Sequence, residues 1–316
     1  METAPPTGLP PGPGARVPAA AAVLAPAAAA VPPDLATCAA CLLELFDPGA
    51  RRHRYAFTGC AACGPRASIA AGPPFARERT ALRRFPMCAA CAAEYRDPAG
   101  RRFRDEAVAC PACGPRLSFL GLSGDAALRA AGALVAAGGV IAVKGPGGTR
   151  LVCDAANADS VARLRHAGGE PALMVPGPAA AAAFGRLTAQ DRRLLASPGA
   201  PVLLVPRREG APAGPPELGL VLPHTPVHHL LLDAVRRPLA VSWAGLPAGP
   251  GRRFDDVDGV LGDDLPAVSA CGAADGSASG SASGAAFGAA DGDTVLRSLG
   301  ARAGGVRAVA VRRGAG

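Results

Sequence analysis

Apolar residues in the second half of the chain follow two alternating periods, one typical of helices and one typical of buried strands. Residues 124–137 carry apolar side chains on one helical face, and Ser123 stands before them as a candidate N-cap. Gly138-Gly139 ends this helix, and the apolar run 140–144 predicts a buried strand. A helix followed by a strand therefore opens this half of the chain.

The same alternation continues to residue 243. Thr188 to Asp191 is a capping-box sequence, and Thr225-Pro226 places proline in a first helical turn. The remaining predicted elements are helices at 159–165, 188–196 and 225–235 and strands at 172–175, 202–205 and 239–243. Strands alternating with helices predict an α/β fold built on a sheet.

The region from residue 38 to residue 113 is organised by cysteine pairs instead. Eight of the ten cysteines form four C-x-x-C pairs: Cys38, Cys41, Cys60, Cys63, Cys88, Cys91, Cys110 and Cys113. The two halves align as a repeat with a period of fifty residues. The repeat also matches Glu44 with Glu94, Arg51-Arg52 with Arg101-Arg102, and Gly64-Pro65-Arg66 with Gly114-Pro115-Arg116. Such a duplication indicates one structural unit used twice.

This spacing predicts two structural Zn²⁺ sites. A C-x-x-C turn presents two thiolates, and two such turns joined by eighteen residues complete a tetrahedron without an open position. Disulfides, which need an oxidising compartment, and redox-active pairs, which normally occur singly on a helix, are the alternatives. Pairing within each half is the simplest arrangement, and pairing across the halves stays open.

The charge balance supports the metal interpretation. The net charge of +8 and the pI near 9.3 are compatible with an anionic substrate, with nucleic acid or with neither. Between residues 38 and 116 arginines outnumber acids by six, and two zinc–tetrathiolate centres lower that excess to about two. We therefore predict that Arg51-Arg52 and Arg101-Arg102 lie against the zinc–thiolate centres.

Lys144 is the one lysine among 33 basic residues, and it ends the first predicted strand. It opens the glycine-rich turn Gly145-Pro146-Gly147-Gly148. A compact ammonium beside exposed backbone N–H groups can hold a phosphate, although the turn alone could be an ordinary one. The candidate anion contacts are Lys144, Gly145, Gly147 and Gly148.

The ends of the chain and one internal segment have low complexity. Residues 1–34 are rich in Pro and Ala and predict a disordered arm, and residues 273–292 predict a flexible insertion. Glu2 stands where a signal peptide would be basic, and no apolar run of eighteen residues occurs, so we expect a cytoplasmic protein without a membrane span. The expected domains are fingers at 35–120 and an α/β domain at 121–316.

The finger region resembles a known family in its cysteine and non-cysteine positions alike. Each half reads C-x-x-C-x-x-E, D-P, R-R and C-x-x-C-G-P-R, and further matches are Arg79-Thr80, Phe85, Met87, Tyr95 and Phe103. This pattern resembles the double zinc finger of the HypF family, the carbamoyltransferases of nickel–iron hydrogenase maturation. It departs at Arg104-Asp105-Glu106, where the family has His-Ala-Gln.

The segment after Cys113 resembles the YrdC-like domain, a twisted sheet with helices, that follows the fingers in HypF proteins. The matching residues are Ile141 to Gly148, Cys153-Asp154-Ala155, Pro171 to Met174, Leu222 to Leu231, and Ser242. The resemblance implies formation of a carbamoyl adenylate from ATP, with Mg²⁺, and carbamate derived from carbamoyl phosphate. It also implies that Ser242 joins Lys144 as a nucleotide or substrate contact.

Several positions of this domain depart from the family pattern. A basic stretch is replaced by the segment His166 to Pro171, which contains Glu170. Arg150 and His224 stand where the family has His and Tyr, and Ala244 replaces an Asn.

Three interpretations therefore stay open. The first is a HypF-like enzyme fragment that works with a HypE-like maturation protein or a separately encoded C-terminal transferase domain. The second is a non-catalytic module that binds double-stranded RNA or a maturation partner. The third is a truncated, degenerate HypF.

The other polar and sulfur-containing residues predict no second site. His53, His228 and His229 are expected to be structural or at the surface, because no open-site metal trio is visible. Cys153 is expected to be a buried apolar residue, and Cys271 a loop residue. A cluster of aspartates predicts a solvated face, and its members are Asp255, Asp256, Asp258, Asp263 and Asp264.

Overall fold

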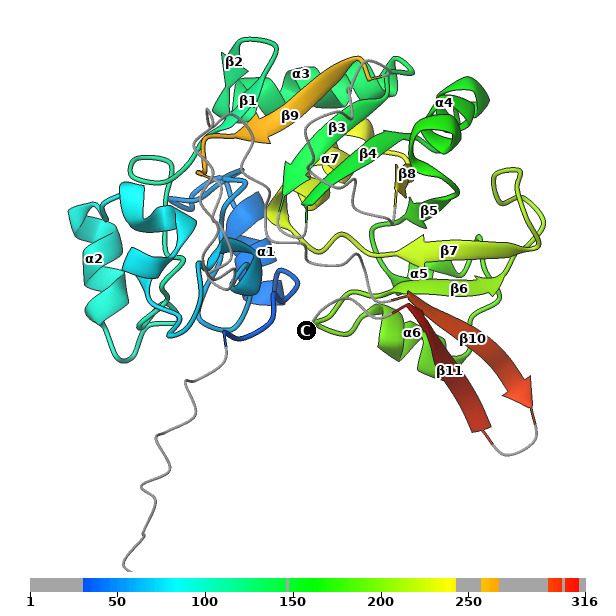
Figure 1. Ribbon diagram of the computed structural model, residues 1–316, viewed down its shortest axis with the longest axis horizontal. Helices are drawn as coiled ribbons and strands as arrows, with labels where there is room; N and C mark the ends of the chain where they lie inside the picture. The colour runs from blue at the N-terminus through cyan, green and yellow to red at the C-terminus, as the bar shows by residue number, and fades with distance from the viewer. Residues whose placement is uncertain (1–30, 146–147, 243–256, 267–294, 303–304, 313–316) are drawn as a thin grey trace, which may run out of the picture.

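The computed structural model describes residues 31–145, 148–242, 257–266, 295–302 and 305–312 (Figure 1). The predicted insertion at 273–292 lies outside these ranges, and so does the predicted arm except for its last four residues. Gly147, Ala244, Asp255, Asp256 and Cys271 are also outside the described residues. Of the arm, Asp34 is held in place, because its carboxylate accepts the N–H groups of Arg66 and Ser68.

The cysteine-rich part consists of two similar finger repeats. In each repeat an eight-residue helix begins directly after the first cysteine: α1 (Ala39–Phe46) and α2 (Ala89–Arg96). Three short 3-10 helices lie between the repeats, at Ala67–Ile69, Arg77–Arg79 and Ala81–Arg84. The first turn of α1 and of α2 thus carries the second cysteine of a C-x-x-C pair, which directs both sulfurs to the same side.

A mixed sheet forms the rest of the described chain. Its order is β11-β10-β6-β7-β5-β8-β4-β3-β9-β1-β2. The strands are β1 (Leu117–Phe119), β2 (Leu122–Ser123), β3 (Ile141–Gly145), β4 (Gly148–Asp154), β5 (Pro171–Met174), β6 (Val202–Pro206), β7 (Glu217–Val221), β8 (Leu239–Ser242), β9 (Gly259–Asp263), β10 (Val295–Arg302) and β11 (Gly305–Arg312). The hairpin β1–β2 belongs to this sheet, so the domain boundary expected at residue 120 falls inside it.

The helices of this part are α3 (Gly124–Ala136), α4 (Ala158–Gly168), α5 (Pro178–Ala181), α6 (Ala189–Leu195) and α7 (Pro226–Val235). Each predicted helix is present, and α4 extends three residues past its predicted end. The capping box of Thr188 with Asp191 is confirmed, and Pro226 lies in the first turn of α7. Ser123 occupies the N-cap of α3 but makes no side-chain capping hydrogen bond. Among the described helices, none has both the length and the apolar character that a membrane span requires.

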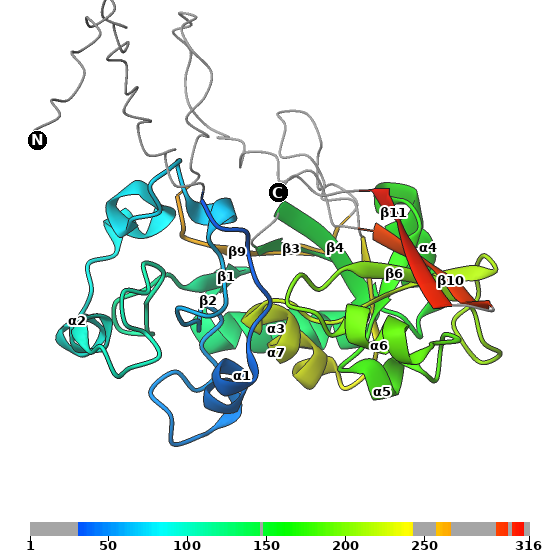
Figure 2. The same ribbon diagram turned by 90° about the horizontal axis from the view of Figure 1, so that it is seen from below.

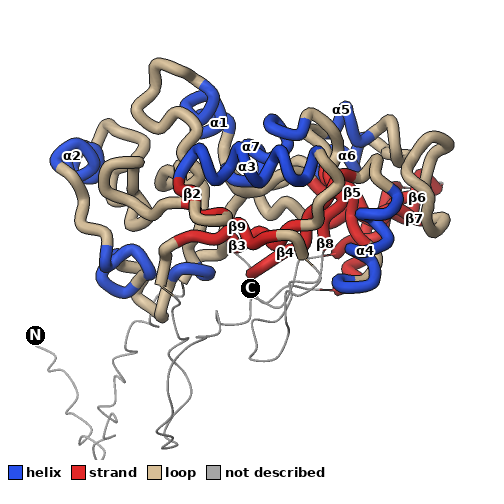
Figure 3. Tube along the Cα trace, turned by 90° about the horizontal axis from the view of Figure 1, so that it is seen from above, coloured by secondary structure: helices blue, strands red, loops and turns tan. Residues whose placement is uncertain are grey.

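Buried apolar side chains fill both faces of the sheet. One core lies between the sheet and the helices α3 and α7 and includes Phe119, Leu128 and Leu230. The other lies between the sheet and α4 and includes Leu151 of β4 and Leu164 of α4. Figure 3 shows α3 and α7 on one side of β3, β4 and β9 and α4 on the other. The alternation of side chains along each strand supplies both cores.

The first finger repeat is part of the α3–α7 core. Leu45 and Ala56 are buried in that core, and α1 lies beside α7 in Figures 2 and 3. Arg54 spans the junction, with Nε 2.8 Å from Asp125 on α3 and Nη1 3.3 Å from Asp233 on α7. The backbone N–H of Thr37 donates to the carbonyl of His224 at 2.9 Å. These contacts fix one finger directly to the sheet domain.

Leu128→Ala should lower the free energy of unfolding of the sheet domain by about 2–5 kcal/mol, because it leaves a cavity between α3 and the sheet. Leu122→Ala is the matched control, since that side chain is 45% exposed whereas Leu128 is fully buried. Urea denaturation followed by circular dichroism measures both. Equal losses in the two variants would contradict the packing described.

Candidate metal centres and anion site

The eight paired cysteines form two separate clusters, one in each finger repeat. Cys38, Cys41, Cys60 and Cys63 make up the first cluster, and Cys88, Cys91, Cys110 and Cys113 make up the second. Within each cluster the four Sγ atoms lie within 4.8 Å of one another. Pairing within each half is therefore confirmed, and pairing across the halves is excluded.

The sulfur positions fit tetrahedral zinc. Sγ–Sγ distances are 3.8, 3.7 and 3.6 Å along the series Cys38, Cys60, Cys63, Cys41. The second cluster has 3.7, 3.7 and 3.6 Å along the equivalent series. A tetrahedron with Zn–S bonds of about 2.3 Å has edges of about 3.8 Å, whereas a disulfide bond is about 2.05 Å. The clusters match zinc coordination and not disulfides.

Arginines from each repeat reach across to the sulfur cluster of the other. Arg101 of the second repeat places Nη1 2.9 Å from Cys41 Sγ in the first cluster. In the reverse direction, Arg51 Nη1 and Arg52 Nη2 lie 3.4 and 3.5 Å from Cys91 Sγ. The predicted role of the arginine pairs beside the metal–thiolate centres is thus confirmed for these three residues. That they cross between repeats could not be deduced from the repeat alone.

Two glutamates complete this reciprocal network. Glu44 accepts from Arg101 and Arg102, and Glu94 lies 2.7 Å from Arg51 and 2.6 Å from Arg52. Burial opposes ionisation of Glu94, but hydrogen bonds from Arg52 and Arg51 outweigh it and lower the pKa of Glu94 to about 2. Glu94 is therefore ionised, and both glutamates hold the guanidinium groups in orientations that meet the sulfurs.

Equivalent arginines of the two repeats also donate to equivalent backbone carbonyls of the other repeat. Arg52, which is only 1% exposed, donates from Nε to the carbonyl of Ala109 at 2.7 Å. Arg102 donates from Nε to the carbonyl of Gly59, which occupies the equivalent position in the other repeat, at 3.0 Å. A buried guanidinium needs several partners to offset its desolvation, and these contacts supply them.

The three positions that depart from the HypF finger pattern have local partners. Arg104 lies 5.5 Å from the ring centroid of Phe103, and Glu106 accepts from the hydroxyl of Tyr95 and from the backbone N–H of Arg77. Asp105 is buried, and burial raises its pKa to about 6. These side chains therefore fold the second repeat against the segment between the repeats.

The predicted anion contacts come together at one end of the sheet. Lys144 and Gly145 end β3, Gly148 begins β4, and Ser242 ends β8. Because β3 and β4 are antiparallel and β4 and β8 are antiparallel, these three strand ends lie at the same edge. Residues about 100 positions apart in sequence therefore border one region.

The two described glycines of the turn leave their backbone accessible. Gly145 pairs with Gly148 in the β3–β4 ladder. A Cβ atom added at either position would meet no atom within 4 Å, and Gly148 has a φ of +109°, which favours glycine. A ligand can therefore approach the backbone of these two glycines closely.

Lys144 is held by the segment that follows β9. Its Nζ lies 2.7 Å from Asp263 Oδ1 and 3.2 Å from the carbonyl oxygen of Leu265. The expectation that the aspartate cluster is a solvated face is wrong for Asp263, whose side chain is only 5% exposed, whereas Asp258 and Asp264 are exposed as predicted. Asp258 accepts the N–H of Val140, and Asp264 accepts that of Arg116. Charge patterning alone did not reveal these long-range partners.

Ser242 is fully buried at the edge of the same region. The Oγ of Ser242 accepts the backbone N–H of Leu151 at 2.9 Å. The backbone of α4 also packs closely on this serine, because a Cβ atom added at Gly168, the last residue of α4, would lie 3.1 Å from the Cβ of Ser242. The neighbouring Arg150 is 5% exposed and places Nη1 3.4 Å from the carbonyl of Ser242. Sequence reasoning did not select Arg150 as a site residue, although it noted that the residue replaces a family histidine.

The histidines of the Leu222–His229 segment are structural. Thr225 Oγ1 lies 2.6 Å from His228 Nδ1, and the rings of His224 and His228 have centroids 4.8 Å apart. Burial, together with the smaller effect of the charge of Arg150, lowers the pKa of His224 to about 3. His224 is therefore neutral near pH 7. Cys153 is fully buried, as predicted, and burial raises its pKa to about 12.

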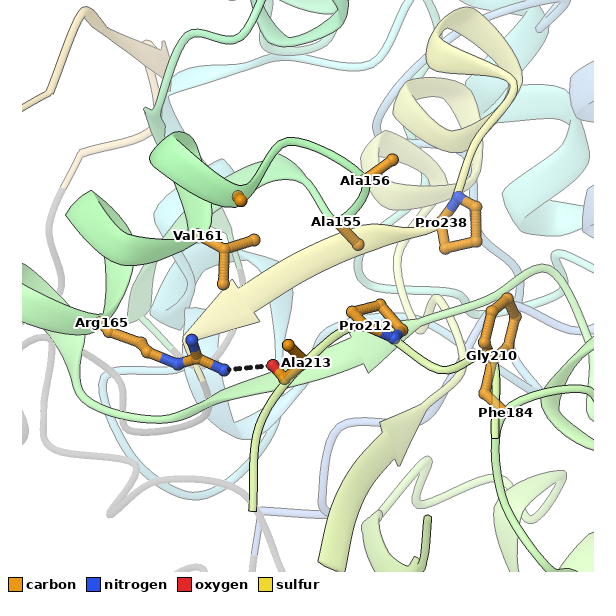
Figure 4. A pocket seen from close by; sticks show the side chains of 10 residues that line it. Ala155, Ala156, Val161, Arg165, Phe184, Gly210, Pro212, Ala213 and Pro238 are labelled. Carbon is orange, nitrogen blue, oxygen red and sulfur yellow. Dashed lines mark hydrogen bonds between the residues drawn. The ribbon is translucent and has the colours of Figure 1, made fainter. Parts of the chain in front are cut away.

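A cavity of about 340 Å³ lies elsewhere, between α4 and the loop around Pro212 (Figure 4). Apolar residues such as Val161 and Phe184 line it, and Arg165 lies at its edge. Arg165 forms a bidentate pair with Glu170, with 2.9 and 3.0 Å contacts, so the acid that replaces a family cation is neutralised locally. Lys144, Gly145, Gly148 and Ser242 are not among the lining residues.

Family models match both parts of the chain. A model described as "HypF finger" matches residues 37–70 and 87–120. A Sua5/YciO/YrdC model, described as "Telomere recombination", matches residues 133–265.

Sequence relatives with both parts are carbamoyltransferases by name. The chain is 45% identical over 231 residues to Carbamoyltransferase HypF of Rhodobacter capsulatus, covering 70% of this chain and 31% of that protein. It is 42% identical over 254 residues to Carbamoyltransferase HypF of Synechocystis sp., covering 74% and 32%. The chain thus spans about a third of the length of the curated relatives it matches.

Solved structures give the same correspondence. HypF of T. kodakarensis is 30% identical with a TM-score of 0.74, covering 90% of this chain and 37% of that one. A full-length HypF in a phosphate- and nucleotide-bound form is 29% identical with a TM-score of 0.71, covering 89% and 37%. The similarity therefore extends over the fingers and the sheet domain together.

The purified protein should contain two zinc ions per chain by elemental analysis. Cys41→Ser or Cys91→Ser should each lower this number, and chelation should unfold residues 38–113, because zinc binding supplies the folding free energy of such small units. Cys153→Ser, which changes a cysteine outside both clusters, should leave two zinc ions bound. A content near zero, with disulfides found by mass spectrometry, would contradict both metal centres.

Arg101→Gln should speed zinc loss from the first cluster, although Arg101 belongs to the second repeat. Losing a charge-assisted hydrogen bond to a thiolate costs about 1.5–3 kcal/mol, which corresponds to roughly tenfold or more in the release rate. A chromogenic chelator measures the rate, and alkylation followed by peptide mass spectrometry identifies which cysteines become reactive first. Arg83→Gln, at an exposed position between the repeats, is the control. Faster alkylation in the second cluster alone would be the contrary result.

Proposed function

This chain belongs to the HypF family by its finger pair and its YrdC-like domain, and on that basis we propose that it forms carbamoyl adenylate from ATP and carbamate. The carbamate derives from carbamoyl phosphate. ATP enters as its Mg²⁺ complex. The proposal concerns the central part of a HypF protein, since the chain spans about a third of its relatives.

The reaction joins two anions. A carbamate oxygen attacks the α-phosphorus of ATP, a P–O bond forms, and the bond to the β-phosphate oxygen breaks so that pyrophosphate leaves with its electron pair. Bringing these reactants together requires fixed positive charge and N–H donors aimed at the phosphoryl oxygens.

The open glycine hairpin beside Lys144 is the observation that carries the proposal. Gly145 and Gly148 have empty space where a side chain would be, and the one lysine of the chain lies next to them. This combination of an ammonium and an open glycine hairpin suits a phosphate site. In the proposal, Lys144 contacts the phosphates, and the backbone of Gly145, Gly147 and Gly148 surrounds the anion.

Ser242 and Arg150 have supporting places in the proposed site. The buried hydroxyl of Ser242 fixes the start of β4 through the N–H of Leu151, so we assign it to the wall of the site. Arg150 adds positive charge to the same strand end and contacts the carbonyl of Ser242. A positive potential at this edge attracts both anionic reactants.

The product requires an acceptor. We propose that carbamoyl adenylate passes through a C-terminal transferase domain, supplied separately, to a HypE-like maturation protein that serves a nickel–iron hydrogenase. Two zinc–tetrathiolate centres suit a reducing compartment, so we place this step in the cytoplasm. The alternative of a non-catalytic RNA-binding module is not favoured, because the named relatives that match both parts are carbamoyltransferases.

Carbamoyl phosphate should stimulate exchange of labelled pyrophosphate into ATP by the zinc-loaded protein, as a reversible adenylation requires. Lys144→Ala should lower this exchange about 100-fold, since a charge aimed at the developing anion is worth several kcal/mol. Arg165→Ala, which removes a half-exposed arginine paired with Glu170, should lower it less than about fivefold. No ATP binding by calorimetry in the intact, zinc-loaded protein would refute the proposed function.

A further inference from the structure

Two partners of Lys144 lie in a short segment, Asp263 to Leu265, that begins with the last residue of β9. This segment lies 119 residues further along the chain than the lysine it contacts. Parallel pairing of β3 with β9 brings the two together, because Val143 aligns with Leu261 two residues before each strand ends. The segment therefore lies in direct contact with the ammonium group of Lys144 in the proposed site.

The finger pair anchors this segment. Leu265 packs against a buried cluster whose core residues are Ile69, Ala81 and Leu82, all from the stretch between the two repeats. Phe85 and Ala107 pack against the same cluster. The backbone N–H of Arg116, at the end of the second repeat, donates to Asp264 Oδ1 at 2.7 Å. These contacts tie Asp264 and Leu265 to the fingers, whereas Asp263, the last residue of β9, pairs with Leu117 of β1 in the sheet.

Asp263 links the backbone of this segment to the side chain of Lys144. Its Oδ1 accepts the backbone N–H of Leu265 at 3.1 Å and also contacts Lys144 Nζ at 2.7 Å. The Asp263 side chain is 5% exposed, whereas that of Lys144 is 23% exposed. A carboxylate this buried is costly without a cation, so the pair orients both side chains. Burial raises the pKa of Asp263, and the charge of Lys144 opposes that shift.

We propose that Asp263 is a positioning residue for Lys144, and that the finger pair sets the place of the ammonium through the Asp263–Leu265 segment. The inference rests on the proposed function only in that Lys144 meets an anionic reactant. A lysine has four flexible methylene groups, and holding its ammonium in advance removes the entropic cost of ordering it when the anion binds. A displacement of about 1 Å at such a group can cost about 100-fold in rate.

The single lysine makes the proposal directly testable. Labelling with ¹⁵N-lysine gives one side-chain Nζ signal in the zinc-loaded full chain. Asp263→Asn removes the carboxylate, and Leu265→Ala loosens the anchor on the fingers while leaving Asp263 intact. Asp258→Asn is the matched control, because it changes an acid beside the start of the same strand whose partners are Val140 and Arg163.

Hydrogen bonds to Asp263 and Leu265 should protect the Nζ protons of the wild-type protein from exchange with water. Asp263→Asn should abolish the protected signal, and Leu265→Ala should shift or broaden it. Asp258→Asn should leave it unchanged, and all variants should retain two zinc ions. ATP should bind about tenfold more weakly to Asp263→Asn and measurably more weakly to Leu265→Ala.

Two results would overturn the inference. One is a wild-type Nζ signal that persists unchanged in both Asp263→Asn and Leu265→Ala. The other is tighter ATP binding to Asp263→Asn, which would make Asp263 a competitor of the anion instead of a support. Failure of ATP to perturb the wild-type signal counts against the proposed function, while the Nζ comparison among variants still decides the positioning role.

Discussion

Two zinc ions bound by eight cysteine thiolates would leave a net charge of about minus two on each centre, and arginines of each finger repeat contact a sulfur of the other repeat's cluster. Arg101 contacts Cys41, and Arg51 and Arg52 contact Cys91. A single repeat would lack the cations that contact its own sulfurs. Arg52 would keep its contact with Glu44 but lose those with Glu94 and Cys91. The duplication is thus a requirement of the electrostatics, and the finger pair is one folding unit.

The two repeats share this network but differ in the face that meets the sheet domain. Leu42, Leu45 and Phe57 of the first repeat pack into the α3–α7 core. The equivalent positions of the second repeat are Ala92, Tyr95 and Ala107. Burying a leucine side chain contributes about 1.5–3 kcal/mol, so the first repeat gains several kcal/mol from docking that the second cannot. The second repeat instead holds the segment between the repeats, which carries the cluster that receives Leu265.

Features set by neighbouring residues could be predicted from sequence, and features set by distant pairing could not. The cysteine spacing predicted two four-cysteine clusters but left open which pairs share a metal, and periodicity with capping residues predicted α3, α6 and α7. The strands β4 and β7 were missed because Thr149-Arg150 and Glu217 interrupt the apolar pattern. The partners of Lys144 and the burial of Ser242 depend on which strands lie side by side. No local pattern encodes that, so the sequence did not reveal that Asp263, one member of the aspartate cluster, is buried beside Lys144.

The sheet edge that holds Lys144 is built from strands far apart in the chain, and this explains why it needs an external support. The β3–β4 hairpin supplies the lysine and the open glycines, β8 supplies Ser242, and β9 delivers Asp263. A strand end has no further ladder hydrogen bonds to hold the residues that follow it, so their position must come from packing. The finger pair provides that packing at Leu265, and its own rigidity derives from the zinc–arginine network. A structural metal unit can in this way determine the geometry of an anion site that contains no metal ligand.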